Sequence, residues 1–179
     1  MKSQDILILL KLVCLKQQLI DEELREQSSV RALEAALGVS KTEVNASINR
    51  SIEAGLAIKD RKIGYPKPNV NALLEFLIHG IKYVFPVKPA EIVRGLPTAF
   101  DAVVLKGELK SAGGIKCVWS DPNGKEQGQA IQPLFRSAPE AAKQDQQLYH
   151  YLALVDAIRI GKPREATLAK QLLKELINT

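Results

Sequence analysis

Two asparagines, Asn45 and Asn49, stand four residues apart. On a helix this spacing places both side chains on one face. An asparagine amide donates and accepts hydrogen bonds at once, the pattern that pairs with the major-groove edge of adenine. Hydroxyl and cationic side chains that suit phosphate oxygens lie nearby. The candidate DNA-binding residues are therefore Lys41, Thr42, Asn45, Asn49, Arg50, Arg61 and Lys62.

A helix over about residues 41–54 must position the asparagines. Ser40 suits its N-cap, and Glu43, three residues later, completes a capping box. Apolar residues spaced four apart, Val44, Ile48 and Ile52, predict one buried stripe. We expect the opposite face to be exposed and to carry Lys41, Thr42, Asn45, Asn49 and Arg50.

The flanking segments predict a second helix and a small hairpin. Residues 29–37 form a short amphipathic pattern, which Gly38 ends as a left-handed C-cap. After the helix of residues 41–54, Gly55 precedes a predicted strand over 56–59. A turn over 60–62 and a return segment over 63–65 follow, so Arg61 and Lys62 fall at the tip of the hairpin.

The segment SVRALEAALGVSKTEVNASINRSIEAGLAIKD resembles the helix-turn-helix and first wing strand of winged-helix transcriptional regulators, in the broad sense that includes MarR-like repressors. The resemblance rests on Leu33, on the turn of residues 36–40, on the stripe of residues 44, 48 and 52, and on the Glu53–Leu56 exit. It covers the N-terminal part of the chain only. It implies a homodimeric regulator of transcription that binds double-stranded DNA, with helix 41–54 in the major groove and Arg61 and Lys62 at the wing.

The composition is compatible with a polyanionic partner. The chain has 179 residues and a formal net charge of +5, which favours nucleic acid without requiring it. Aromatic residues make up only 5%. A surface that stacks unpaired bases needs exposed aromatics, so single strands and RNA loops are disfavoured as partners.

The sequence predicts a cytoplasmic protein. Cys14 and Cys117 lie far apart in apolar surroundings, so we expect two buried, reduced thiols. No apolar stretch reaches the eighteen residues of a membrane span. Asp5 and Lys11 interrupt the apolar N-terminus, and no cleavage site follows, which argues against a secretory signal.

The pattern of residues predicts no enzyme, no cofactor and no metal site. Neither His79 nor His150 has a carboxylate or thiol at ligand spacing. Gly113 and Gly114 lack the lysine and following hydroxyl of a phosphate-binding loop. A nucleophile elbow is also missing from the sequence.

The predicted fold class is mainly α with small β elements, in two regions. Residues 1–85 comprise a first helix over 5–19, the winged helix-turn-helix, and a helix over 70–84. Residues 86–179 contain predicted strands over 103–105, 115–119 and 129–131, the last two joined as a hairpin by the turn of residues 121–124. An antiparallel helix pair over 148–160 and 163–177 follows.

Three functions stay open at this point. The chain is a DNA-binding regulator, or it is an antitoxin-like interaction protein whose C-terminal half binds a cognate partner, or its helix-turn-helix contacts protein alone. The helices of residues 70–84, 148–160 and 163–177 could form a dimer or close the monomer core. For Trp119 and the loop of residues 95–100, a structural role is favoured over a pocket or docking surface.

Overall fold

The computed structural model describes residues 1–59, 64–105 and 116–178. Within these ranges the elements are α1 (Ser3–Gln18), α2 (Asp21–Gln27), α3 (Val30–Leu37), α4 (Lys41–Glu53), β1 (Ala57–Lys59), β2 (Pro66–Pro68), α5 (Val70–Glu75), the π-helical turn η1 (Phe76–Gly80), α6 (Ile81–Val84), β3 (Ile92–Pro97), the 3₁₀ turns η2 (Ala99–Asp101) and η3 (Val103–Leu105), β4 (Cys117–Ser120), β5 (Glu126–Ala130), α7 (Ala138–Gln144), α8 (Gln146–Ile160) and α9 (Pro163–Asn178). The predicted fold class, mainly α with small β elements, is confirmed.

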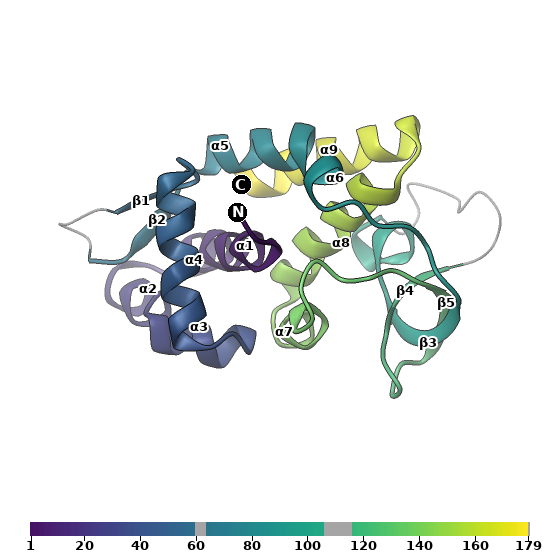
Figure 1. The fold of residues 1–179 in the computed structure, drawn as a ribbon, viewed down its shortest axis with the longest axis horizontal. Helices are drawn as coiled ribbons and strands as arrows, with labels where there is room; N and C mark the ends of the chain where they lie inside the picture. Colours follow the sequence, from purple (N-terminus) through teal and green to yellow (C-terminus); the bar gives the residue numbers. More distant parts are fainter. Residues whose placement is uncertain (60–63, 106–115, 179) are drawn as a thin grey trace.

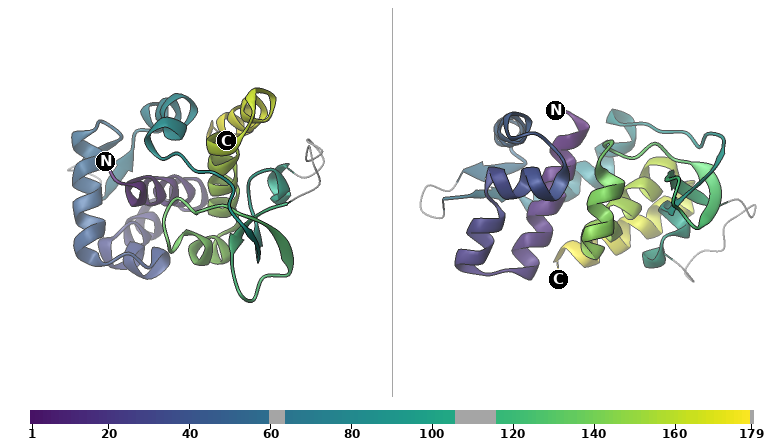
Figure 2. Two further views of the ribbon diagram at one scale, coloured as in Figure 1. Left: turned by 45° about the vertical axis from the view of Figure 1, so that its right-hand side comes forward. Right: turned by 90° about the horizontal axis from the view of Figure 1, so that it is seen from below.

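The molecule is elongated, with α1 near its middle (Figures 1 and 2). At one end lie α2, α3, α4 and the β1–β2 hairpin. At the other end lie the strands β3, β4 and β5, with α8 and α9 between them and α1. The buried apolar side chains of both regions form one continuous cluster, so the two ends share a core.

Helix α1, predicted over residues 5–19, is buried along most of its length. The side chains from Ile6 to Leu10 are no more than 1% exposed. Three polar residues along α1 bind three different parts of the chain. Asp5 pairs with Arg50 of α4, Lys11 with Asp145 at the start of α8 at 2.8 Å, and Gln17 with two carbonyls at the end of α9.

The predicted helix, turn and helix occur, and two antiparallel strands follow them; the predicted turn of the hairpin, residues 60–62, lies outside the described residues. Gly38 takes φ +62° and ends α3, a conformation that favours glycine. The Ser40 side chain accepts from the backbone N–H of Glu43 and caps α4, but the Glu43 carboxylate binds Arg50, so the predicted capping box is only half formed. The return strand lies later than predicted, at Pro66–Pro68, and pairs antiparallel with β1. The polar residues 21–27 form α2 around the buried Leu24.

The predicted hairpin around Trp119 is wrong in its pairing. Both strands exist, but β4 and β5 run parallel to each other, and each pairs antiparallel with β3. The three strands close on themselves. Glycine permits this closeness, because a Cβ on Gly95 would lie 2.0 Å from the carbonyl oxygen of Trp119, and one on Gly128 would lie 2.3 Å from that of Lys116. The alternation of apolar and polar residues in the sequence does not indicate this close approach, because the approach depends on glycines, which have no side chain.

Residues 103–105 were predicted as a strand but form the 3₁₀ turn η3. The predicted helix of residues 70–84 is continuous from α5 to α6, with the π-helical turn η1 inside it. Helices α8 and α9 pack together, and the chain turns at Gly161 and Lys162 between them. Because residues 151–158 of α8 are all buried in the monomer, this helix closes the chain's own core.

A buried polar cluster joins the strands to α8. Asp156, 1% exposed, accepts hydrogen bonds from the indole N–H of Trp119 at 2.6 Å and from the hydroxyl of Thr98 at 3.0 Å. Arg159 binds the other carboxylate oxygen at 2.7 Å and also donates to the carbonyl of Phe85. Trp119 therefore has the structural role that the sequence favoured.

Cys14 and Cys117 are both buried and unpaired, as predicted. Burial raises the pKa of the Cys117 thiol to about 11, which keeps it protonated and unreactive near neutrality. Across the described ranges, no helix has both the length and the apolar content that crossing a membrane requires.

Candidate functional site

The exposed face of α4 consists of Lys41, Thr42, Asn45 and Asn49, all of which are exposed to solvent as predicted. Asn45 and Asn49 make no hydrogen bond to any other described residue. The buried stripe behind them includes Val44, 0% exposed, and Ile48, 9% exposed. The structure therefore brings four of the seven candidate residues onto one free surface of one helix.

Arg50 differs from the prediction, because it points toward α1 and not to the exposed face. Its guanidinium donates twice to the Asp5 carboxylate, from Nε at 3.0 Å and from Nη2 at 2.7 Å. The same Nη2 lies 2.6 Å from Glu43, which also accepts from the amide of Gln4. The paired geometry makes Arg50 a clamp between α4 and α1.

The electrostatics of this clamp follow from burial and hydrogen bonding. Burial alone would raise the pKa of Asp5, but the hydrogen bonds from Arg50 and from the backbone N–H of Lys2 hold that pKa below its ordinary value. The hydrogen bond from Arg50 likewise lowers the pKa of Glu43. All three groups are thus charged at neutral pH, and the clamp fixes the orientation of α4.

The N-terminus of α4 is already occupied by a carboxylate. Glu34 of α3 accepts from the backbone N–H of Lys41 at 3.2 Å, and its second oxygen lies 3.8 Å from the Lys41 ammonium. Free backbone N–H groups at a helix start can bind phosphate. At Lys41 a phosphate would have to displace Glu34, so Lys41 offers its side chain and not its backbone N–H.

A groove of about 400 Å³ separates α4 from the hairpin. One wall is α4, with Asn45 and Asn49 at its rim, and the other wall is the hairpin. Most of the exposed lining is apolar. The lining residues are Val30, Asn45, Ile48, Asn49, Ile52, Lys59, Gly64, Tyr65 and Pro66. The two candidate asparagines therefore border an apolar surface and do not stand on a uniformly polar one.

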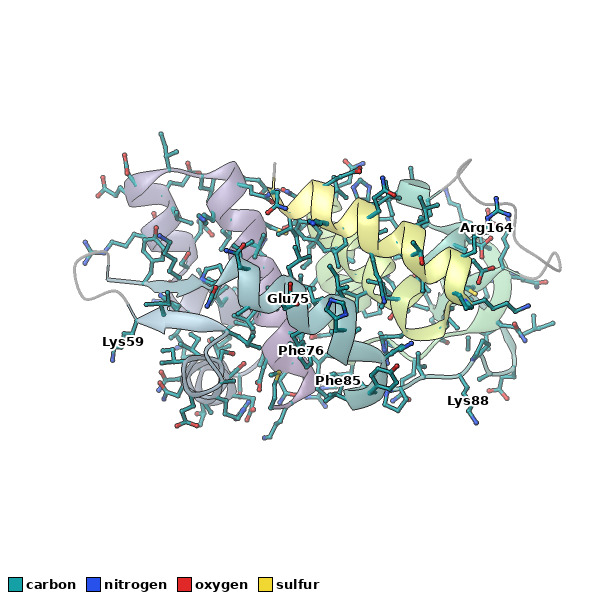
Figure 3. The ribbon with its side chains drawn as sticks, turned by 90° about the horizontal axis from the view of Figure 1, so that it is seen from above. Lys59, Glu75, Phe76, Phe85, Lys88 and Arg164 are labelled. Atoms are coloured by element: carbon teal, nitrogen blue, oxygen red, sulfur yellow. The ribbon has the colours of Figure 1, made fainter. Side chains whose placement is uncertain are left out.

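The hairpin adds one described cation to the groove. Lys59 is exposed on β1 at the edge of the molecule, beside α4 (Figure 3). Arg61 and Lys62, the predicted contacts at the hairpin tip, lie outside the described residues. Their proposed role therefore stays a prediction.

Sequence reasoning missed both the clamp and the groove. The signal for Asp5 was a lone carboxylate at the start of an apolar helix, which requires a partner once that helix is buried. No signal pointed to Tyr65, because its place in the groove depends on where β2 begins. The same signal applies to Asp156, because it is a single carboxylate within an apolar helix and therefore requires a partner when that helix is buried.

No three histidine, cysteine or carboxylate residues in the described ranges are grouped so that they could hold a metal ion. Comparison of the whole chain with protein-family models, with curated proteins and with solved structures gave no match.

Proposed function

We propose that the chain binds double-stranded DNA and regulates transcription, with the exposed face of α4 in the major groove. The observation that supports this most is the free pair Asn45 and Asn49, one helical turn apart and bound to no described residue. An α-helix fits the major groove, and an asparagine amide matches adenine in two hydrogen bonds. Lys41 and Thr42 at the same end suit phosphate oxygens.

Arg50 has a different role in this proposal. Because its guanidinium is bound to Asp5 and Glu43, we assign it to positioning α4 and not to direct DNA contact. Arg61 and Lys62 are proposed as backbone or minor-groove contacts, as the resemblance to winged-helix regulators implies. Lys59, on the described part of the hairpin, is added as a phosphate contact.

We propose a homodimer as the acting form, because regulators of this kind read two half-sites with two-fold symmetry. A cytoplasmic location belongs to the same proposal. It is supported by two buried, unpaired thiols, which suit a reducing compartment.

A protein partner for the same face is the alternative. The apolar lining of the groove favours it, because Ile52 and Tyr65 could receive apolar side chains of a partner. Under this alternative, duplex DNA would not compete for the face, and a partner would be retained in high salt.

The test uses the purified full chain and a labelled duplex from its own upstream DNA, with random duplex as competitor. We expect selective binding that the double variant Asn45→Ala/Asn49→Ala weakens at least tenfold, since one good asparagine–adenine pair contributes about 1–3 kcal/mol. The matched control is Gln127→Ala, an exposed amide on β5 far from α4. Equal binding of the upstream and random duplexes by the natural chain, or equal affinity of Asn45→Ala/Asn49→Ala and Gln127→Ala for the upstream duplex, would contradict the proposal.

A further inference from the structure

The groove beside α4 places hydrogen-bonding and apolar groups next to each other. Asn45 and Asn49 border the same groove as Ile52 and Tyr65. Ile52 is half-buried and packs against the core, which fixes its position. The part of its side chain that stays exposed is apolar and lines the groove. A ligand in this groove would therefore meet amide and hydrocarbon side by side.

One base pair of duplex DNA matches this combination. In the major groove, adenine shows an acceptor and a donor, which an asparagine amide satisfies together. Its partner thymine shows a C5-methyl group, which only an apolar surface can receive with a gain in free energy. A G·C pair offers no such methyl, and its donor and acceptor positions differ.

We infer that the groove between α4 and the β1–β2 hairpin is a thymine-methyl subsite, so that the chain reads A·T base pairs by amide and methyl together. The inference rests on the proposed DNA-binding function and specifies its substrate. Asn45 and Asn49 select adenine, while Ile52 and Tyr65 contact the methyl. Lys59 lines the same groove from β1, on the opposite wall, where its ammonium suits a phosphate oxygen.

The test changes the DNA first, because such changes cannot unfold the protein. Four duplexes of about 24 base pairs, two turns long, are compared by fluorescence anisotropy with the full chain. They contain alternating A·T, A·U, G·C or G·5-methylcytosine pairs. Uracil removes only the methyl from thymine, and 5-methylcytosine adds only the methyl to cytosine.

We expect A·U to bind about fourfold more weakly than A·T for each methyl that enters the groove, the effect of burying one such group. The methylated G·C duplex should bind more tightly than the plain one. In the variant Ile52→Ala, checked for folding by circular dichroism, the ratio of A·T to A·U affinity should fall toward one. In Asn45→Ala/Asn49→Ala the preference for A·T over G·C should fall while the methyl effect stays.

Equal affinity for A·T and A·U, with binding retained, would overturn the thymine-methyl subsite and leave the proposed DNA-binding function intact. Binding to none of the four duplexes would overturn the thymine-methyl subsite, and binding to the upstream duplex then tests the proposed DNA-binding function by itself. A methyl effect that survives unchanged in Ile52→Ala and in Tyr65→Ser would also overturn the subsite, since the methyl would then be read elsewhere.

Discussion

Arg50 illustrates how one residue can support the proposed DNA-binding surface without belonging to it. Its two hydrogen bonds to Asp5 cross from α4 to the N-terminal turn of α1, where the Asp5 side chain has no exposure to solvent. A carboxylate in that position is costly unless it is paired. The ion pair therefore determines the orientation of α4 relative to α1. That orientation in turn sets the direction in which Asn45 and Asn49 point.

Arg50→Ala should lower the free energy of unfolding by about 3 kcal/mol, because it leaves the Asp5 charge buried and unpaired. Arg50→Lys should lose less, since it keeps the charge but not the two-pronged geometry. Chemical denaturation followed by circular dichroism measures both changes. Lys41→Ala, which removes only an exposed ion pair with Glu34, should change stability by less than about 1 kcal/mol. An equally small effect of Arg50→Ala would show that the clamp does not hold α4.

Asp5 and Asp145 make stability depend on acid pH. Burial opposes ionisation of Asp145, but Lys11 and the backbone N–H of Leu148 hold its pKa below the ordinary value, as Arg50 does for Asp5. Both carboxylates thus bind protons less readily in the folded chain than in the unfolded chain, where the pKa of aspartate is about 3.9. Their contribution is complete above that pKa and is lost as pH falls through the lower folded values.

Unfolding by denaturant at neutral pH and at about pH 3 should therefore show a loss of stability in acid. Asp145→Asn keeps an N-cap for α8 but removes the ion pair with Lys11. It should be less stable than the natural chain at neutral pH and should lose less on acidification. A variant with the same acid dependence as the natural chain would contradict the assignment to Asp145.

At the scale of elements, glycines shape the three-stranded unit. Gly128→Ala would place a Cβ 2.3 Å from the carbonyl oxygen of Lys116, a backbone atom that cannot move aside without breaking the pairing of β4 and β5. We expect a loss of about 2 kcal/mol or more, within the usual range for forced overpacking. The fluorescence of Trp119, the one tryptophan of the chain, measures this loss during unfolding, because its indole is buried and hydrogen-bonded to Asp156.

Gln127→Ala, next to Gly128 in β5 and exposed, serves as the control and should leave the Trp119 fluorescence and the unfolding midpoint nearly unchanged. If Gly128→Ala were as stable as this control, the close approach of the three strands would be wrong.

Elements with local signals were predictable from the sequence. Gly38 and Ser40 marked the turn between α3 and α4, because one backbone conformation and one cap determine it. The strand pairing around Trp119 was not predictable, since a turn signal at residues 121–124 also fits an ordinary hairpin. In the candidate site, the exposed face of α4 could be predicted from the four-residue spacing of its apolar side chains alone. The orientation of Arg50 did not, because Asp5 lies forty-five positions earlier in the chain.

The whole molecule places the candidate interface and the three-stranded unit at opposite ends, with α1 between them (Figure 1). Ser137, at the start of α7, donates to the carbonyl of Leu37 and so supports the end of α3 from the C-terminal region. Residues from both the N-terminal and the C-terminal regions thus support the position of α3 and α4. Experiments on the interface therefore require the full chain.

The arrangement allows a comparison in which total charge stays constant and only its position differs. Asn49→Glu adds one negative charge to the exposed face of α4, and Gln127→Glu adds one at the far end on β5. Each variant changes the formal net charge from +5 to +4 (one negative charge added to +5). Any general loss of attraction for DNA is then equal in the two.

The most direct measurement is the affinity of these two variants and the natural chain for upstream duplex DNA, at low and moderate salt, after circular dichroism has shown equal folding. With α4 in the major groove, Asn49→Glu should bind at least tenfold more weakly than Gln127→Glu, because it loses a base contact and meets phosphate repulsion. Gln127→Glu should stay close to the natural chain. Equal affinity of the two variants would contradict the claim that the exposed face of α4 contacts DNA.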